Sequence, residues 1–87
     1  MKFQTNKSFE RDLNKSPSAL ISEVLAIYNQ VSNAQNLKDI PNLKKLSGYK
    51  NVYRIRVGEY RIGLYVEEDT IVFGRILPRK EIYRFFP

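Results

Sequence analysis

The chain has 87 residues, which is the length of one domain, and we expect that domain to span residues 1–87. Hydrophobic residues make up 43% of it and charged residues 28%, a composition that indicates a folded globular protein and excludes a disordered one. The absence of cysteine and histidine excludes a disulfide framework, a thiolate zinc site and a histidine general base. No apolar run is long enough to span a membrane, so we expect a cytoplasmic protein without cofactor or metal.

The positive charge of the chain is concentrated in its second half. The net charge is +6, from 15 Lys and Arg against nine Asp and Glu. Residues 1–33 hold four basic and three acidic side chains, whereas residues 44–61 hold six basic side chains and one acidic one. This local excess predicts a surface that meets a phosphate-rich or acidic partner. A basic face that is merely solvated is the alternative, which composition alone favours.

The N-terminal part of the chain predicts a short extended segment followed by a helix. The segment Lys2–Thr5 precedes Asn6, whose side-chain oxygen can cap a helix. Phe9 and Leu13 are four residues apart, which places both on one face of that helix.

A second helix is expected to begin at Pro17, with Ser16 as its N-cap. Its apolar residues recur at steps of three and four, which predicts an amphipathic helix of about four turns that supplies the core. The apolar stripe consists of Leu20, Val24, Ile27, Tyr28 and Val31, and it is widened by Ile21 and Leu25.

Residues 32–51 have the composition of a connection held down by single apolar side chains. The connection is long for a structureless loop, so we expect local structure or a function there. A helical turn around Leu43–Leu46 is the expected local structure.

From Val52 the hydrophobic period changes to two, which is typical of strands. Gly58 and Glu59 separate two alternating runs, and this spacing predicts a hairpin with a type II′ turn. A third strand is expected from residue 70 to about residue 77, after an acidic turn at residues 67–69.

The C-terminal residues 79–86 are expected to form a closing helical turn, from which Phe85 or Phe86 packs back on the core. The predicted order is β-α-α-β-β-β. We therefore expect an α+β domain with an antiparallel sheet packed against two N-terminal helices.

The turn at Gly58 fixes which side chains share a face of the hairpin. With a two-residue turn, Arg56 lies opposite Arg61 and Arg54 lies opposite Gly63, and opposed residues point to the same side. The core face is then expected to hold Tyr53, Ile55, Val57, Tyr60, Ile62, Leu64 and Val66. The opposite face holds Arg54, Arg56, Arg61 and Tyr65.

Two directly opposed arginines, here Arg56 and Arg61 without evident partners, destabilise a sheet. An anion between their guanidinium groups would turn this cost into a binding site, because the planar fork of arginine matches phosphate. The hairpin therefore predicts a phosphate-binding surface, and a solvated basic face is the alternative.

Gly63 is open to two interpretations that the sequence weighs evenly. If residues 68 and 69 form a two-residue turn, Gly63 faces Gly74, and the open face has a floor that a ligand or another backbone can approach closely. The other interpretation is a β-bulge, because Arg75 would otherwise point into the core.

Three runs of this chain carry a resemblance to a known family. They are Leu43-Lys-Lys-Leu-Ser-Gly48, Tyr53-Arg-Ile-Arg-Val-Gly-Glu-Tyr-Arg-Ile62 and Leu77-Pro-Arg-Lys-Glu-Ile-Tyr83. In these runs, in length and in element order, the whole chain resembles the RelE/ParE superfamily of toxins from type II toxin–antitoxin systems. The RelE-like branch consists of ribosome-dependent mRNA endonucleases, and the ParE-like branch inhibits DNA gyrase by binding.

The resemblance to the RelE-like branch implies a set of site residues and partners. Basic residues on the sheet and a C-terminal tyrosine surround the scissile phosphate there, and the matching residues are Arg54, Arg56, Arg61, Arg79 and Tyr83. The resemblance also implies that the arginines bind the phosphate and that Tyr83 stacks on a base or transfers a proton. The RNA's own 2′-OH is the nucleophile, which leaves a 2′,3′-cyclic phosphate and a 5′-OH. The implied partners are mRNA, the ribosome and a cognate antitoxin, with no membrane.

Two positions depart from the RelE-like pattern. That branch often has a lysine where Arg54 stands, and several members have a histidine where Pro78 stands. The general base is therefore unassigned among Glu59, Glu81 and Tyr83, although positioning and charge stabilisation can supply much of the rate. The alternatives are a ParE-like, non-catalytic inhibitor of DNA gyrase and a degenerate member that binds only its antitoxin.

Overall fold

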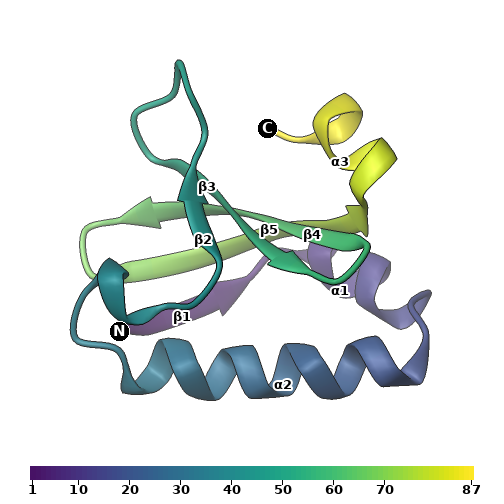
Figure 1. Ribbon diagram of the computed structural model, residues 1–87, viewed down its shortest axis with the longest axis horizontal. Helices are drawn as coiled ribbons and strands as arrows, with labels where there is room; N and C mark the ends of the chain where they lie inside the picture. The colour runs from purple at the N-terminus through teal and green to yellow at the C-terminus, as the bar shows by residue number, and fades with distance from the viewer.

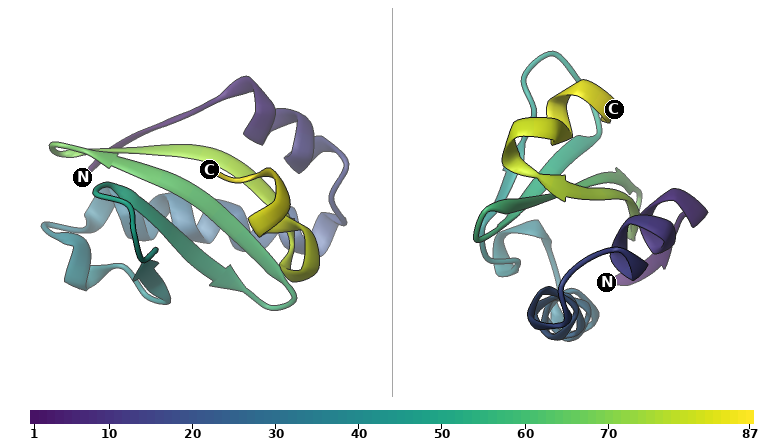
Figure 2. Two further views of the ribbon diagram at one scale, coloured as in Figure 1. Left: turned by 90° about the horizontal axis from the view of Figure 1, so that it is seen from above. Right: turned by 90° about the vertical axis from the view of Figure 1, so that its right-hand side faces the viewer.

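The computed structural model describes residues 1–87, which form one five-stranded sheet with helices on both faces. In chain order the elements are β1 (Lys2–Thr5), α1 (Lys7–Asn14), α2 (Ser18–Asn33), the 3-10 helix η1 (Leu37–Asp39), β2 (Leu43–Lys45), β3 (Val52–Val57), β4 (Tyr60–Glu67), β5 (Thr70–Pro78) and α3 (Arg79–Phe85). Helix α2 runs along one face of the sheet and α3 lies over the other (Figure 1), and Figure 2 shows these layers from two further sides. No helix combines the length and the apolar character needed to cross a membrane.

The sheet has the strand order β1-β5-β4-β3-β2. Strands β2 to β5 pair in antiparallel fashion, but β1 runs parallel to β5, with Lys2 beside Thr70 and Thr5 beside Phe73. The α+β class and the two N-terminal helices are confirmed, and the expectation of an entirely antiparallel sheet is wrong at this edge. A tight turn forces neighbouring strands to be antiparallel, whereas β1 reaches β5 only through the rest of the chain, so no local turn fixes its direction.

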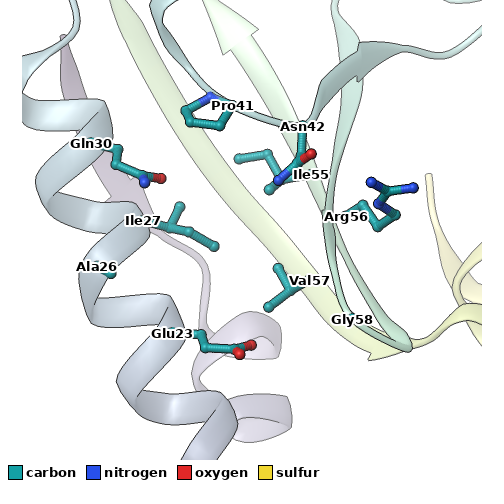
Figure 3. Close-up of a pocket in the computed structure, with 10 residues that line it drawn as sticks. All are labelled: Glu23, Ala26, Ile27, Gln30, Pro41, Asn42, Ile55, Arg56, Val57 and Gly58. Atoms are coloured by element: carbon teal, nitrogen blue, oxygen red, sulfur yellow. The ribbon is translucent and has the colours of Figure 1, made fainter.

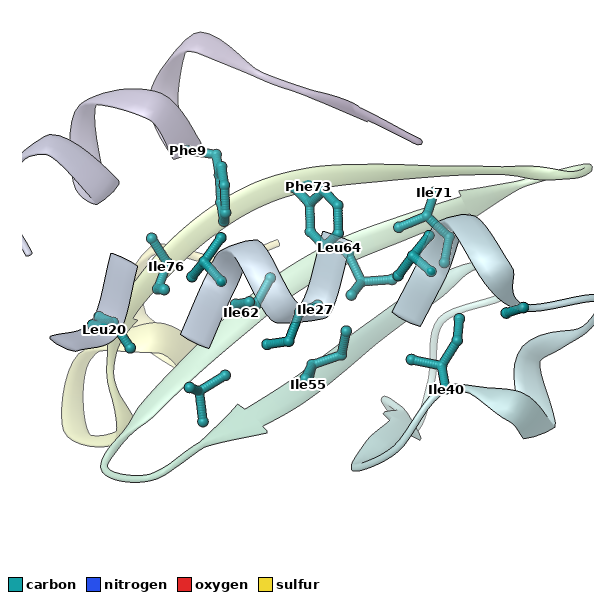
Figure 4. Packing of buried hydrophobic residues seen from close by; sticks show 14 residues of the cluster. Phe9, Leu20, Ile27, Ile40, Ile55, Ile62, Leu64, Ile71, Phe73 and Ile76 are labelled. Atoms are coloured by element: carbon teal, nitrogen blue, oxygen red, sulfur yellow. The ribbon is translucent and has the colours of Figure 1, made fainter. Parts of the chain in front are cut away.

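The hydrophobic core lies between the sheet and helices α1 and α2, and we call this side of the sheet the inner face (Figure 4). The expected alternation along β3 and β4 is confirmed, because every second residue packs there. Ile55, Val57, Ile62 and Leu64 are buried, and Tyr53, Tyr60 and Val66 pack at the margin. Helix α2 contributes Leu20, Val24, Ile27 and Val31, and α1 contributes Phe9.

The two helices differ from expectation at their N-caps and on one face. The N-cap of α2 is Pro17, and the Ser16 hydroxyl instead donates a 2.9 Å hydrogen bond to the Asp12 carbonyl. Asn6 stands at the N-cap of α1, but its side chain makes no capping hydrogen bond. Leu25 does not widen the buried stripe, because 56% of it is exposed. The 3.6-residue period of the helix turns it away from the sheet.

The connection between α2 and β3 contains a 3-10 helix and a short strand, where only a helical turn was expected. Asn36 and Asp39 form a capping box around η1. Residues Leu43–Lys45 form a strand, not the expected helical turn, and pair with residues 53–55 of β3. The main chain of β3 offers hydrogen-bonding groups along its free edge, and pairing with β2 satisfies them better than an isolated helical turn would.

The hairpin of β3 and β4 has the predicted register, with Arg56 opposite Arg61 and Arg54 opposite Gly63. At the turn, Gly58 has a positive φ of 57°, whereas the φ of Glu59 is not positive. A positive φ at the first turn residue alone is the mark of a type II′ turn, as expected. The next turn, at residues 68 and 69, also has two residues, since Glu67 pairs with Thr70.

Gly74 is the extra residue of a β-bulge, so of the two interpretations of this region the bulge is confirmed and the direct pairing of Gly63 with Gly74 is not found. Leu64 pairs with Phe73, but Gly63 pairs with Arg75. The extra residue keeps Phe73 in the core and turns Arg75 out of it.

Candidate functional site

The side of the sheet opposite α1 and α2, which we call the outer face, carries a compact group of cations. Arg56 and Arg61 form one cross-strand pair, and Arg54 lies beside Gly63 in the next row. In Figure 3 the Arg56 side chain points away from α2, whereas Ile55 and Val57 on either side point toward it. The structure therefore brings the three predicted strand arginines together on one face.

Lys44 extends this group and was missed as a site residue. It pairs with Arg54 across β2 and β3, and opposed residues of paired strands point to the same side. The sequence shows two basic residues at positions 44 and 45. Which of them lies on the outer face is determined only once this segment is known to be a strand. We call Lys44, Arg54, Arg56 and Arg61 the cationic group.

No carboxylate neutralises the cationic group. The ion pairs of the structure lie elsewhere, between Lys2 and Asp69 and between Arg75 and Asp12. Two of its arginines, Arg54 and Arg61, are held by main-chain carbonyls. The group is therefore a partly fixed and uncompensated positive surface.

Main-chain carbonyls orient two of the arginines. Arg54 Nη1 donates to the Asn42 carbonyl at 3.0 Å, and Arg61 Nη1 donates to the carbonyls of Gly58 at 2.8 Å and Tyr60 at 2.9 Å. The expectation that Arg61 has no partner is therefore wrong, whereas the exposed Arg56 makes no side-chain hydrogen bond. Each guanidinium has five N–H donors, so donors of all three arginines remain available for an anion.

Helix α3 is fixed to the outer face at both ends. At its start the Arg79 amide donates to the Glu59 carbonyl at 2.8 Å, which ties the helix to the β3–β4 turn. After its end, Phe86 is buried and packs with Val52 and Ile82. Of the two phenylalanines considered, it is Phe86 that packs back on the sheet.

Gly63 leaves room for the chain's own phenylalanine. A Cβ atom at Gly63 would overlap the ring of Phe86, and one at Gly74 would lie 3.0 Å from it. Tyr65 completes the contact, with its ring centroid 5.2 Å from that of Phe86. The close approach that an interior strand glycine indicates is therefore made by Phe86, and the floor of the outer face is covered there.

Arg79 and Tyr83 lie on α3, which packs over the outer face, and they border separate hollows. Arg79 borders a pocket of about 250 Å³ with Glu59, Pro78 and Lys80. Tyr83 is one helical turn further on, 56% exposed, and borders a pocket of about 300 Å³ at the opposite end of the helix. The five predicted residues thus share the outer face, but they do not line one pocket.

The structure does not single out a general base. Glu59 borders the same pocket as Arg79, whereas Glu81 and Tyr83 are exposed on α3. No group of three or more carboxylates comes together in a way that could hold a metal ion. The chemical resources of the outer face are therefore positive charge, hydrogen-bond donors and an aromatic ring.

Arg75 differs from the arginines of the cationic group, because it is paired with a carboxylate and has a structural role. Its Nε donates to the Asp12 carboxylate at 2.7 Å and its Nη2 at 3.1 Å, and the Ile76 amide donates to the same carboxylate at 3.1 Å. These hydrogen bonds to Asp12 raise the pKa of Arg75 above its ordinary value. Arg75 thereby holds α1 against the bulge in β5, a partnership that the cationic group lacks.

A second hollow, of about 290 Å³, separates α2 from β3 (Figure 3). Glu23, Ile27 and Gln30 reach into it from α2, and Arg56 borders it from the strand but points its guanidinium away. With a carboxylate and an amide facing it and no cation turned inward, this hollow does not suit an anion.

Comparison with known proteins places the chain in a family. A family model described as ParE toxin of type II toxin-antitoxin system, parDE, matches residues 4–83. Toxin RelE3 of Methanocaldococcus jannaschii is 44% identical over 88 residues, which cover 100% of both chains.

Solved structures agree with this assignment. A chain in the RelB-RelE antitoxin-toxin complex from Methanococcus jannaschii has a TM-score of 0.81 and 42% identity over 100% of both chains. The archaeal RelE-RelB complex from Pyrococcus horikoshii OT3 contains a chain of the same fold, with a TM-score of 0.75 and 21% identity, covering 93% of this chain and 97% of that one. The chain therefore belongs to the RelE/ParE superfamily, the toxins of type II toxin–antitoxin systems.

Proposed function

We propose that this toxin is an endoribonuclease that cleaves mRNA on the ribosome. The observation that supports the proposal is the cationic group, because four like charges on one sheet face without a carboxylate partner are costly unless an anion binds there. Phosphate is the anion that fits best, since arginine presents a rigid fork of donors to it.

In the proposed reaction the 2′-oxygen of one ribose attacks the adjacent phosphorus as its proton leaves. The bond from phosphorus to the 5′-oxygen breaks, and that oxygen takes up a proton. The products are a 2′,3′-cyclic phosphate and a 5′-OH. Negative charge grows on the non-bridging phosphate oxygens, and Arg54, Arg56 and Arg61 would stabilise it with donors already oriented before the reaction.

The residues on α3 would complete this site. Arg79 would add a cation beside the β3–β4 turn, and Tyr83 would stack on a base or transfer a proton. No side chain is assigned as general base. The proposed rate enhancement rests on holding the 2′-oxygen in line with the phosphorus and on charge stabilisation.

The direct test is primer extension on cellular mRNA after induced expression of the toxin. We expect new 5′ ends in messages that ribosomes are translating, and none in the same messages when initiation is blocked. The absence of new ends would refute the endoribonuclease. If growth then still stops and purified protein inhibits supercoiling by DNA gyrase, the ParE-like activity takes its place, and normal growth would favour a member that binds only its antitoxin.

We also propose that a cognate antitoxin covers the cationic group. The related chains from M. jannaschii and P. horikoshii were both solved in complexes of RelE with RelB, which supports a partner of this kind. An acidic, partly disordered segment would suit a surface of net positive charge, because such segments fold as they wrap around their partner.

The antitoxin proposal can be tested through RNA binding. The free protein should bind RNA with an affinity that falls steeply with salt, because each phosphate contact releases counterions. With antitoxin added at a one-to-one ratio, we expect this RNA affinity to drop sharply. Unchanged RNA binding by the complex would contradict the proposal that the antitoxin covers this face.

A further inference from the structure

We propose that Arg75 is a positioning residue for the proposed reaction, because it holds the C-terminal end of α3, and with it Tyr83, through the ring of Phe85. This inference rests on the proposed function and deepens it. Arg75 acts through α3 and not on the substrate. The inference also gives the exposed Phe85 a role, which the hydrophobic core does not.

The contacts that bury α3 lie along one side of the helix. Ile82 and Phe86 are four residues apart and pack together on the sheet, where the Phe86 ring fills the space above Gly63. At about 100° per residue, Tyr83 and Phe85 lie roughly 80° to either side of the line through Ile82 and Phe86. A helix held along one line can roll about it, so a contact at Phe85 determines where Tyr83 lies on the other side.

Phe85 makes such a contact although 53% of its ring is exposed. The guanidinium carbon of Arg75 lies 5.8 Å from the ring centroid, and that of Arg84 lies 5.6 Å from it. Both distances allow the attraction between a cation and an aromatic face. Arg84 belongs to α3 and moves with the helix, whereas Arg75 belongs to β5. Only the contact with Arg75 can therefore fix α3 to the sheet.

Arg75 is itself held in place before it meets Phe85. Its Nε and Nη2 donate to the Asp12 carboxylate at 2.7 and 3.1 Å, and a paired contact of this kind fixes the plane of the guanidinium. Ordering a free arginine side chain against a ring would cost rotamer entropy, and Asp12 has already imposed that order. The series Asp12, Arg75 and Phe85 thus connects α1 to α3 across the edge of β5.

The position of α3 matters for the proposed reaction because Tyr83 has to meet a base or a proton. A displacement of about 1 Å from the productive geometry can cost about 10²-fold in rate. The phosphate is bound by the cationic group, which lies on strands that Arg75 does not move. Loss of the contact between Arg75 and Phe85 should therefore lower kcat and leave KM nearly unchanged.

The first measurement is amide hydrogen exchange of the full chain, which reports on α3 without any chemistry. We expect Arg75→Met and Phe85→Leu to speed exchange in α3 about two- to fivefold, the change that an exposed cation–aromatic contact is worth, and to leave exchange in α2 unchanged. Arg84→Met is the matched control, because it removes a guanidinium at a similar distance from the same ring. It should exchange like the wild type, and so should Phe85→Trp, which keeps an aromatic face for Arg75.

The second measurement is the rate of mRNA cleavage on ribosomes. We expect Arg75→Met and Phe85→Leu to lower kcat about tenfold and to change KM less than about twofold, and Phe85→Trp and Arg84→Met to keep both values. Phe85→Leu leaves Arg75 paired with Asp12, so it decides the matter if Arg75→Met does not fold.

Unchanged exchange or unchanged kcat in Phe85→Leu, a loss that lies in KM, or equal effects of Arg84→Met would each overturn the inference. If the wild type cleaves no mRNA, the proposed function fails, and hydrogen exchange still decides whether Arg75 holds α3.

Discussion

The two faces of the sheet use neighbouring residues of the same strands in opposite ways. Ile62 on the inner face is completely buried, whereas the adjacent Arg61 on the outer face donates only to main-chain carbonyls of its own hairpin. The inner face is packed along its length by α1 and α2. The outer face is covered only in part, by the small cluster of Val52, Ile82 and Phe86.

The inner face therefore stabilises the fold, whereas the outer face is available for binding. Burial of apolar side chains on the inner face provides most of the stabilising free energy. The side chains of the cationic group repel one another, and only Arg54 and Arg61 make hydrogen bonds, to nearby main-chain carbonyls, so the group contributes little to the stability of the fold. Changes on the two faces should therefore affect different measurements.

The largest expected effect is on activity, from the double variant Arg56→Ala/Arg61→Ala. Removing one preorganised donor from a transition state typically costs about 10² to 10³ in rate, so we expect mRNA cleavage to fall by at least about 10³-fold and toxicity to disappear. The thermal midpoint should stay within a few degrees of the wild type, because a like-charge pair is lost together with the two carbonyl contacts of Arg61.

The control for this variant removes the same charge from other parts of the surface. Lys7→Ala/Lys38→Ala takes two exposed cations from α1 and η1. It should leave cleavage and toxicity intact. If it abolishes them equally, net charge and not the outer face is responsible.

The next effect is on stability, from Ile62→Ala on the inner face. A fully buried isoleucine leaves a cavity when it is truncated, and the expected loss in the free energy of unfolding is about 2–5 kcal/mol. Arg56→Ala, an exposed outer-face substitution, should change the same quantity by less than about 0.5 kcal/mol. Urea denaturation measures both, and similar losses for the two variants would contradict the proposed division between the faces.

A smaller loss is expected where the outer face is covered. Gly63→Ala would place a methyl group in the space of the Phe86 ring, and overpacking of this kind costs about 1–3 kcal/mol. The cost should nearly vanish in a Phe86→Ala background, which a double-mutant cycle measures. An undiminished cost there would show that backbone strain at Gly63, and not the contact with Phe86, is the cause.

The smallest expected effect is a pH dependence of the stability, which comes from Tyr28 on α2. Burial raises the pKa of Tyr28 above its ordinary value of 10.0, and the negative charge of Glu10 adds to this. The folded state therefore holds this proton more tightly than the unfolded state, so the contribution is present below about pH 10 and is lost as the pH rises above that value.

Comparison with Tyr28→Phe isolates this contribution from that of the other tyrosines. Between about pH 8 and about pH 10.5 the thermal midpoint of the wild type should fall slightly further than that of Tyr28→Phe. Parallel decreases would mean that the packing of Tyr28 against Phe3 and Phe73 does not restrict its ionisation.

The parts of the fold that could be predicted are those set by local patterns. The two-residue turn at Gly58 fixes the pairing of Arg56 with Arg61, because a period of two and a short turn leave one register. The buried stripe of α2 follows from its spacing of three and four. The Gly74 bulge was one of two interpretations, since a glycine in a strand is compatible with both.

The candidate site was predictable to the same extent. The strand arginines came from the register, whereas Arg79 and Tyr83 came from the resemblance to a family, and their roles stay predictions.

By itself the sequence determined the α+β class, the two N-terminal helices, the hairpin and the basic character of one of its faces, because each depends on periodicity or on a tight turn. Three features were decided by the tertiary structure alone: the parallel pairing of β1 with β5, the strand at Leu43–Lys45 and the packing of the Phe86 ring against Gly63. Each of these joins segments whose individual preferences are weak, so the choice is made by hydrogen bonds and packing that exist only once the sheet has formed.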